Sequence, residues 1–123
     1  MCQKAFGGYF GPLVTARELR WTRGAPSYFQ SSNRVRRGFC AACGTPLTFE
    51  PVGGAVDVAI GAFDRAAEIT PVLQLSEAAR LPSFDGLSSL RTVTDREREK
   101  FAAHYDAIVS FQHPDHDTDT RPK

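Results

Sequence analysis

Short hydrophobic segments separated by turn-forming residues fill most of the first 75 positions of the chain. In the segment 56–60, Val56 and Val58 flank Asp57, and such alternation is typical of a strand with one buried face. Similar segments, each bounded by Gly, Pro or polar residues, lie at 9–10, 13–14, 28–29, 35–39 and 47–49. Short strands at this spacing, without alternating helices, predict a mostly β fold.

One helix is predicted after the strands. Thr94 and Glu97 have the spacing of a capping box, and Phe101, Tyr105, Ile108 and Val109 recur at helical intervals. We expect this hydrophobic face to pack on the sheet.

These patterns divide the chain into three segments. A β domain is predicted at 1–93, in which 81–87 forms an ordered loop rich in Pro and Gly. The C-terminal helix at 94–112 packs on this domain. The polar stretch at 113–123 is predicted to be a disordered tail.

Composition and charge narrow the class of protein. A chain of 123 residues is expected to form one domain. Its 15 Lys and Arg residues nearly balance 14 Asp and Glu residues, so we expect neither nucleic acid nor an anionic membrane as a partner. The sequence contains no hydrophobic run of about 18 residues that would suggest a membrane span. The first residues do not resemble a signal peptide, and a cytoplasmic location is expected by default.

Three cysteines carry the clearest chemical signal. An odd number argues against a closed disulfide framework. Cys40 and Cys43 have two residues between them, which lets both sulfurs bind one zinc ion at about 2.3 Å, and Gly44 suits the tight turn at this point. The alternatives are two small buried residues at a hairpin, or a redox pair. A zinc knuckle is the favoured interpretation.

The chain is short of further zinc ligands. Structural zinc sites take four protein donors, and the remaining cysteine is Cys2. His104 falls inside the predicted helix, where a surface position is expected. His113 and His116 lie in the polar tail, which is expected to be solvated. The count is therefore one or two ligands short.

Several segments, taken in order, resemble the glutathione-dependent formaldehyde-activating enzyme (GFA) family, whose domain is also found in centromere protein V. They lie at 2–5, 19–22, 31–32, 39–47, 56–64 and 81–87, and the resemblance covers roughly residues 1–90. It implies a compact, zinc-binding, β-tent-like fold with zinc as the cofactor. It also implies a carbon–sulfur lyase that acts on a thiol–aldehyde adduct, such as S-hydroxymethylglutathione.

The family pattern also implies roles for individual cysteines. Cys40 and Cys43 match its late structural pair, and Cys2 matches the last cysteine of its middle motif. Cys2 is therefore both the candidate catalytic residue and a candidate metal ligand, together with Cys40 and Cys43. The family's earlier cysteines have no counterpart, so we expect that the N-terminal part of the domain is missing and that Met1 is not its natural start.

Two functions remain open at this point. The first is the zinc-dependent lyase, with weak zinc binding and little activity because so few ligands are present. The alternative is a non-catalytic, zinc-stabilised binding module, in which Arg34, Arg36 and Arg37 contact an acidic partner. A solvated strand face is the simpler interpretation of these arginines. The sequence does not indicate an oligomeric state.

Overall fold

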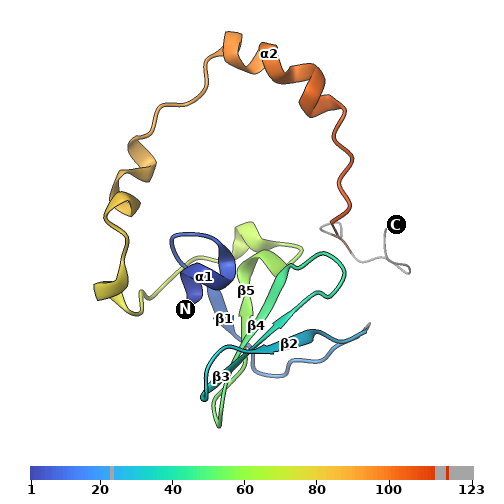
Figure 1. The fold of residues 1–123 in the computed structure, drawn as a ribbon, viewed down its shortest axis with the longest axis vertical. Helices are drawn as coiled ribbons and strands as arrows, with labels where there is room; N and C mark the ends of the chain where they lie inside the picture. Colours follow the sequence, from blue (N-terminus) through green and yellow to red (C-terminus); the bar gives the residue numbers. More distant parts are fainter. Residues whose placement is uncertain (23, 113–115, 117–123) are drawn as a thin grey trace.

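The computed structural model describes residues 1–22, 24–112 and 116. Apart from His116, the predicted tail at 113–123 lies outside the described residues. The helices and strands in chain order are α1 (Cys2–Phe6), β1 (Leu13–Thr15), β2 (Ser27–Gln30), β3 (Val35–Phe39), β4 (Pro46–Pro51), β5 (Asp57–Ala59) and α2 (Asp95–Asp106) (Figure 1). Short 3-10 helices lie at Ile60–Ala62, Ala66–Glu68, Glu77–Ala79 and Pro82–Ser89.

The five strands form one antiparallel sheet in the order β1-β5-β4-β3-β2. Strands β2 to β5 pair with their sequence neighbours, and β1 closes the far edge by pairing with β5. Strands lie at five of the six predicted segments, but residues 9–10 form no strand. The fold is a small mixed α/β domain rather than a mostly β one. The difference arises because α1 and the 3-10 helices occupy segments that carry no clear helical period in the sequence.

The hydrophobic core of the described residues is small and lies on the central strands. Its buried hydrophobic side chains are Val35, Val58 and Ala59. Two polar residues, Arg37 on β3 and Thr48 on β4, are equally buried. Because so few hydrophobic groups are buried, we expect the polar contacts of β3 and β4 to carry much of the specificity of the fold.

Gly38 allows β3 and β4 to approach closely. Its backbone N–H donates to Thr48 Oγ1 at 3.1 Å, and a Cβ at this position would lie 2.4 Å from the same oxygen. Thr48 donates in turn to Glu50 Oε1 at 2.7 Å. The strand register shifts between Gly38 and Phe39, and such a bulge redirects the end of the strand, here the part that leads to Cys40.

The 3-10 segment at Pro82–Ser89 replaces the predicted loop and lies against the N-terminal region. The ring of Phe84 meets that of Phe10 edge to face, with centroids 5.5 Å apart. Gln3 Nε2 also donates to the carbonyl oxygen of Ala79 at 2.9 Å. These contacts join the N-terminal region to segments more than 70 residues away in the sequence.

The predicted capping box of α2 is confirmed. The backbone N–H of Glu97 donates to Thr94 Oγ1 at 3.3 Å, and the N–H of Thr94 donates to Glu97 Oε2 at 2.8 Å. Both terminal nitrogens of the Arg91 guanidinium also donate to this carboxylate, at 2.8 and 2.9 Å. No helix in the described part of the chain is long and apolar enough to cross a membrane.

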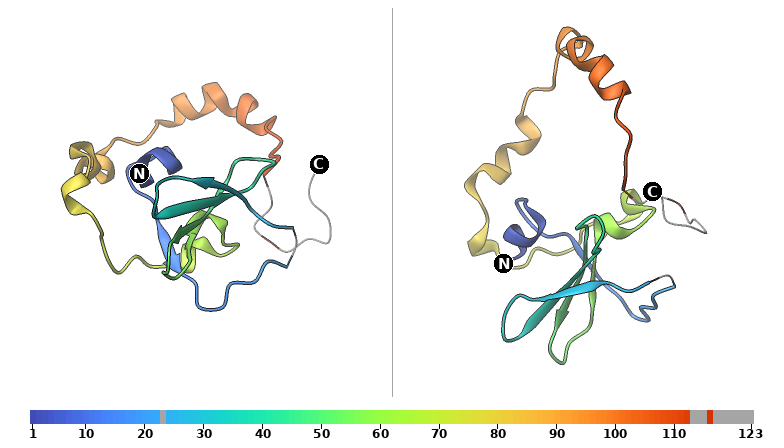
Figure 2. Two further views of the ribbon diagram at one scale, coloured as in Figure 1. Left: turned by 60° about the horizontal axis from the view of Figure 1, so that its bottom comes forward. Right: turned by 45° about the vertical axis from the view of Figure 1, so that its right-hand side comes forward.

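Helix α2 does not pack on the sheet as the sequence predicts. It has no buried residue, and it lies on an arch of chain that leads away from the sheet (Figures 1 and 2). Its end at Asp106 is the physical reason, because Ile108 and Val109 fall outside the helix and the predicted hydrophobic face is incomplete. Phe101 and Tyr105 remain, with 46% and 61% of their surface exposed. The helix predicted at 94–112 therefore spans only Asp95–Asp106, and the domain boundary at 93 stays a prediction.

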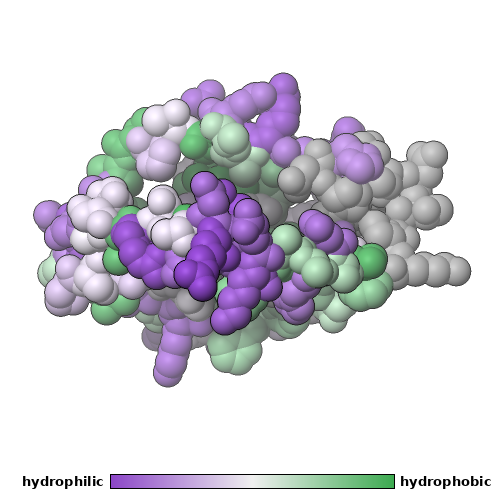
Figure 3. Space-filling view, turned by 90° about the horizontal axis from the view of Figure 1, so that it is seen from above, coloured by the Kyte–Doolittle hydropathy of each residue, from purple (hydrophilic) through white to green (hydrophobic). Residues whose placement is uncertain are grey.

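Exposed hydrophobic residues are common along this arch. Viewed from above, hydrophobic residues are interspersed with hydrophilic ones on this face (Figure 3). The most exposed of them in the segment between β5 and α2 are Val72, Leu73, Leu75 and Leu90. A scattered arrangement of this kind does not by itself indicate a partner.

We expect Gly38→Ala to destabilise the fold by about 1–3 kcal/mol, because the added Cβ would lie 2.4 Å from Thr48 Oγ1 and 3.2 Å from the Cβ of Pro26. Gly86→Ala is the matched control, since a Cβ there meets no atom within 4 Å. Urea unfolding followed by circular dichroism measures both variants. Equal stability of Gly38→Ala and the unsubstituted chain would contradict the close approach.

The start of α2 should be sensitive to acid. Hydrogen bonds from Arg91 and then from Thr94 lower the pKa of Glu97 from its usual 4.5 to about 2. Because the folded pKa is below the unfolded one, the contribution of the cap is complete above about pH 5 and is lost as the pH falls toward 2. Backbone chemical shifts of residues 95–106 measure this titration. The Glu97→Gln variant should not show this titration, whereas the control variant Glu99→Gln should still show it. Helical chemical shifts that stay unchanged down to pH 2 would contradict a role of Glu97 in the cap.

Candidate site around the three cysteines

Cys40 and Cys43 lie in the turn that joins β3 to β4, as the sequence predicts. The N–H of Cys40 donates to the carbonyl oxygen of Thr45 at 2.9 Å, and the N–H of Gly44 donates to that of Cys40 at 2.8 Å. Gly44 has a φ of 75°, which is strained for any residue with a side chain. Both cysteines are half-buried. The turn therefore holds two thiols at the end of the sheet.

The C-terminal part of the described chain reaches this turn. Cys43 Sγ lies 3.0 Å from Thr45 Oγ1, and Thr45 Oγ1 donates to Gln112 Oε1 at 3.1 Å. The chain thus returns to the sheet after α2, although the helix itself does not. Sequence reasoning missed this contact, because nothing in the local pattern of Gln112 indicates a partner 67 residues away.

The donors at the knuckle do not meet the needs of a structural zinc ion. Such an ion takes four donors in a tetrahedron. Among the described residues, no group of three or more His, Cys, Asp or Glu side chains is placed to hold a metal ion. The knuckle supplies two donors, and Cys2 is not grouped with them. The described residues therefore do not complete a zinc site.

Cys2, in α1, lies next to β3 of the same hairpin. Its Sγ accepts a hydrogen bond from Arg37 Nη2 at 3.4 Å. Arg37 is only 7% exposed, and its guanidinium carbon lies 4.9 Å from the centre of the Phe49 ring. A buried cation packed on an aromatic ring therefore contacts the thiol directly.

Sequence reasoning missed Arg37 as a site residue, because the simplest interpretation of the arginines at 34, 36 and 37 is a solvated strand face. A signal was nevertheless present. Arg36 and Arg37 are adjacent in one strand, so their side chains must point to opposite faces of the sheet. One of the two had to face the side on which α1 lies.

Gly11 fixes the position of Cys2. A Cβ on Gly11 would lie 2.7 Å from the ring of Phe6 and 3.1 Å from the Cβ of Cys2. Because Gly11 has no side chain, α1 can pack directly against its backbone. Gly8 is closer to α1 in the sequence but is less crowded. A Cβ on Gly8 would lie 3.9 Å from its nearest neighbour, the carbonyl oxygen of Phe10.

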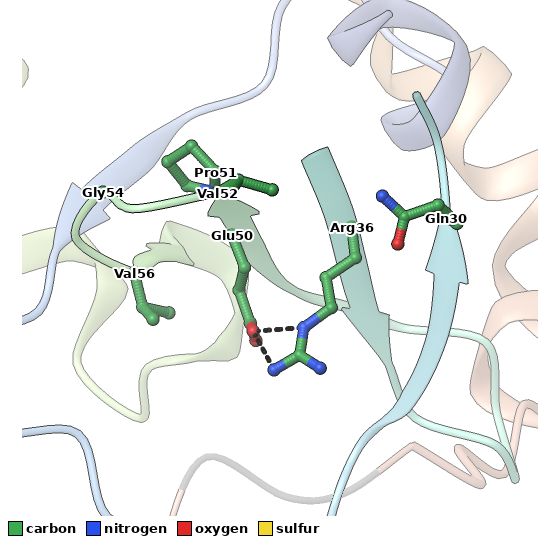
Figure 4. A pocket seen from close by; sticks show the side chains of 7 residues that line it. All are labelled: Gln30, Arg36, Glu50, Pro51, Val52, Gly54 and Val56. Carbon is green, nitrogen blue, oxygen red and sulfur yellow. Dashed lines mark hydrogen bonds and ion pairs between the residues drawn. The ribbon is translucent and has the colours of Figure 1, made fainter. Parts of the chain in front are cut away.

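Arg36 takes part in a polar network on the other face of the sheet. Its Nε and Nη2 contact Glu50 Oε2 at 2.8 and 2.7 Å (Figure 4), and its guanidinium carbon lies 4.1 Å from the centre of the Tyr28 ring. Burial, followed by the negative charge of Glu50, raises the pKa of Tyr28. Arg37 is buried, whereas Arg36 is paired with Glu50 and keeps 51% of its side chain exposed.

This network borders an open pocket of about 370 Å³. The lining residues are Gln30, Arg36, Glu50, Pro51, Val52, Gly54 and Val56. They belong to β2, β3 and β4 and to the turn before β5, and none is a cysteine. The pocket is therefore separate from the candidate cysteine site.

The fold and the cysteine positions define a small α/β domain with a two-thiol turn on an antiparallel sheet. Residues 1–78 match the model of the glutathione-dependent formaldehyde-activating enzyme family. The chain belongs to this family. The match contains α1, all five strands and the three cysteines. It ends before 81–87, whereas the resemblance of the individual motifs extends through that segment.

Neither the curated proteins nor the solved structures compared with the chain gave a match. Family membership suggests a role of the formaldehyde-activating, carbon–sulfur lyase kind. Proteins of the family typically bind zinc.

We expect Gly11→Ala to displace α1 and to expose Cys2, because its Cβ overlaps Phe6. Modification of the Cys2 thiol by iodoacetamide, followed by mass spectrometry of the N-terminal peptide, should become several-fold faster. Gly8→Ala is the matched control and should leave the rate unchanged. Equal rates in all three proteins would show that Gly11 does not hold Cys2 in place.

Proposed function

We propose that the chain acts on a thiol–aldehyde adduct of the glutathione type as a carbon–sulfur lyase. One observation carries this proposal: the family match spans the whole sheet and every cysteine. Because the described residues do not complete a zinc site, roles in the reaction are assigned to side chains of the protein alone.

The reaction places specific demands on its site. In a hydroxymethyl thioether, the sulfur–carbon bond breaks, formaldehyde leaves, and the hydroxyl proton passes to the sulfur; the reverse reaction forms the adduct. Negative charge develops on the departing sulfur. A fixed cation in a partly dry site stabilises such charge more than water does.

Arg37 is the side chain that fits this demand. Its buried guanidinium already donates to one sulfur, that of Cys2, and it cannot lose its charge in a protein. We assign it the role of holding the sulfur of the substrate next to Cys2, the candidate catalytic residue. The aromatic ring of Phe49 beneath it keeps the guanidinium in place.

The test follows the exchange between glutathione, formaldehyde and their adduct by two-dimensional NMR, with and without added zinc. We expect exchange to be faster than the uncatalysed rate, although slow, because so few metal ligands are present. Arg37→Met keeps the contact with Phe49 but removes the donor, and should return exchange to the uncatalysed rate. Arg36→Met is the matched control on the same strand and should retain activity.

Two results would contradict the proposal. Exchange by the unsubstituted chain at the uncatalysed rate would favour the non-catalytic binding module. Faster exchange that persists in Arg37→Met and Cys2→Ser would place the reaction elsewhere on the molecule.

A further inference from the structure

We propose that β2 pairs with β2 of a second copy of the chain, so that the two sheets join into one continuous antiparallel sheet. The inference starts from the strand order, in which β2 (Ser27–Gln30) is an outer strand with β3 on its inner side (Figure 1). It concerns the association of two chains and does not depend on the proposed lyase reaction.

The hydrogen-bond pattern of β2 shows which of its backbone groups face outward. The N–H of Ser31 donates to the carbonyl oxygen of Val35 at 3.0 Å, and Phe29 lies two positions earlier in the same register with β3. Hydrogen-bonded and non-hydrogen-bonded pairs alternate along an antiparallel ladder. The backbone of Phe29 therefore faces β3, whereas the N–H and C=O groups of Tyr28 and Gln30 face the open edge. No described residue outside the sheet bonds to these outward groups.

The side chains along this edge do not oppose pairing. Edge strands are commonly protected from pairing by charged residues. Residues 24–33 contain no charged residue, although 24% of the chain is charged. Phe29, in the middle of β2, has 64% of its surface exposed. The other outer strand, β1 (Leu13–Thr15), has three residues, of which two are half-buried, so β2 is the edge that favours a partner strand.

A two-fold axis at Phe29 gives the register that uses all of the outward groups. Tyr28 of each copy then lies opposite Gln30 of the other, and each of these pairs exchanges two backbone hydrogen bonds. The two Phe29 side chains face each other at the centre as a close, non-hydrogen-bonded pair. An axis at Tyr28 would instead place Gln30 opposite Pro26, which has no N–H to donate. A symmetric pairing of this kind closes as a dimer.

The same register gives the open pocket a wall from each chain. Gln30 lines the pocket beside the Arg36–Glu50 pair (Figure 4). Residues that lie opposite each other in an antiparallel pair point to the same face of the sheet. In the dimer, Tyr28 of the second copy therefore lies beside Gln30 at the rim of the pocket.

Sedimentation velocity of the full chain at increasing concentration, under reducing conditions, tests the association. A pairing of two short strands is small compared with the roughly 1,200 Å² or more that stable interfaces bury, so we expect a dimer that dissociates on dilution and no larger species. Phe29→Lys places two positive charges opposite each other at the centre and should raise the dissociation constant of the dimer about tenfold or more. Leu90→Lys is the matched control, since Leu90 is 69% exposed on the arch, and it should leave association unchanged.

Cysteine cross-linking tests the register. A non-hydrogen-bonded pair brings its Cα atoms to about 4.5 Å, within the range of a disulfide. Phe29→Cys should therefore form a disulfide between two chains on mild oxidation with diamide, and Leu90→Cys should not. Mass spectrometry of the linked peptides separates this bond from disulfides of the three native cysteines.

Three results would overturn the inference. A chain that stays monomeric at every concentration and gives no cross-link through Phe29→Cys would exclude the pairing. A dimer that persists unchanged in Phe29→Lys would show that another surface holds the two chains together, as would equal cross-linking of Leu90→Cys. Circular dichroism verifies that the Lys variants are folded, which we expect because both side chains are largely exposed. None of these results bears on lyase activity, which the NMR exchange assay measures by itself.

Discussion

The hydrogen bond from the backbone of Gly38 to the hydroxyl of Thr48 is the contact on which the arrangement of this domain depends. It brings β3 and β4 together at the centre of a sheet that buries few hydrophobic side chains. Directly after it the register shifts, and the chain enters the turn that carries Cys40 and Cys43. In a domain with so small a core, one close polar contact of this kind helps to set the position of the thiols.

The same strand divides the molecule into two chemically different faces. Arg36 points to one face and pairs with Glu50 beside the open pocket. Arg37 points to the other, where it is buried between Phe49 and the sulfur of Cys2. The alternation of a β-strand therefore gives two adjacent arginines different roles: one stabilises the pairing of strands, and the other places a permanent charge next to a thiol.

Local patterns in the sequence predicted the parts of the structure that depend on local geometry. Alternation in 56–60 indicated β5, the Thr94–Glu97 spacing indicated the cap of α2, and the Cys-x-x-Cys-Gly pattern indicated the turn. Packing was predicted less well. The hydrophobic period suggested a longer helix, but the helix ends at Asp106, and contacts between distant segments, such as Thr45 with Gln112, leave no local signal.

Amide hydrogen exchange tests the central role of the β3–β4 contact most directly. If the Gly38–Thr48 hydrogen bond anchors the sheet, the Gly38 amide should be among the slowest to exchange and should open only with global unfolding. The amides of α2, a helix with no buried residue, should exchange much faster. Exchange of the Gly38 amide as fast as that of α2 would contradict this account of the fold.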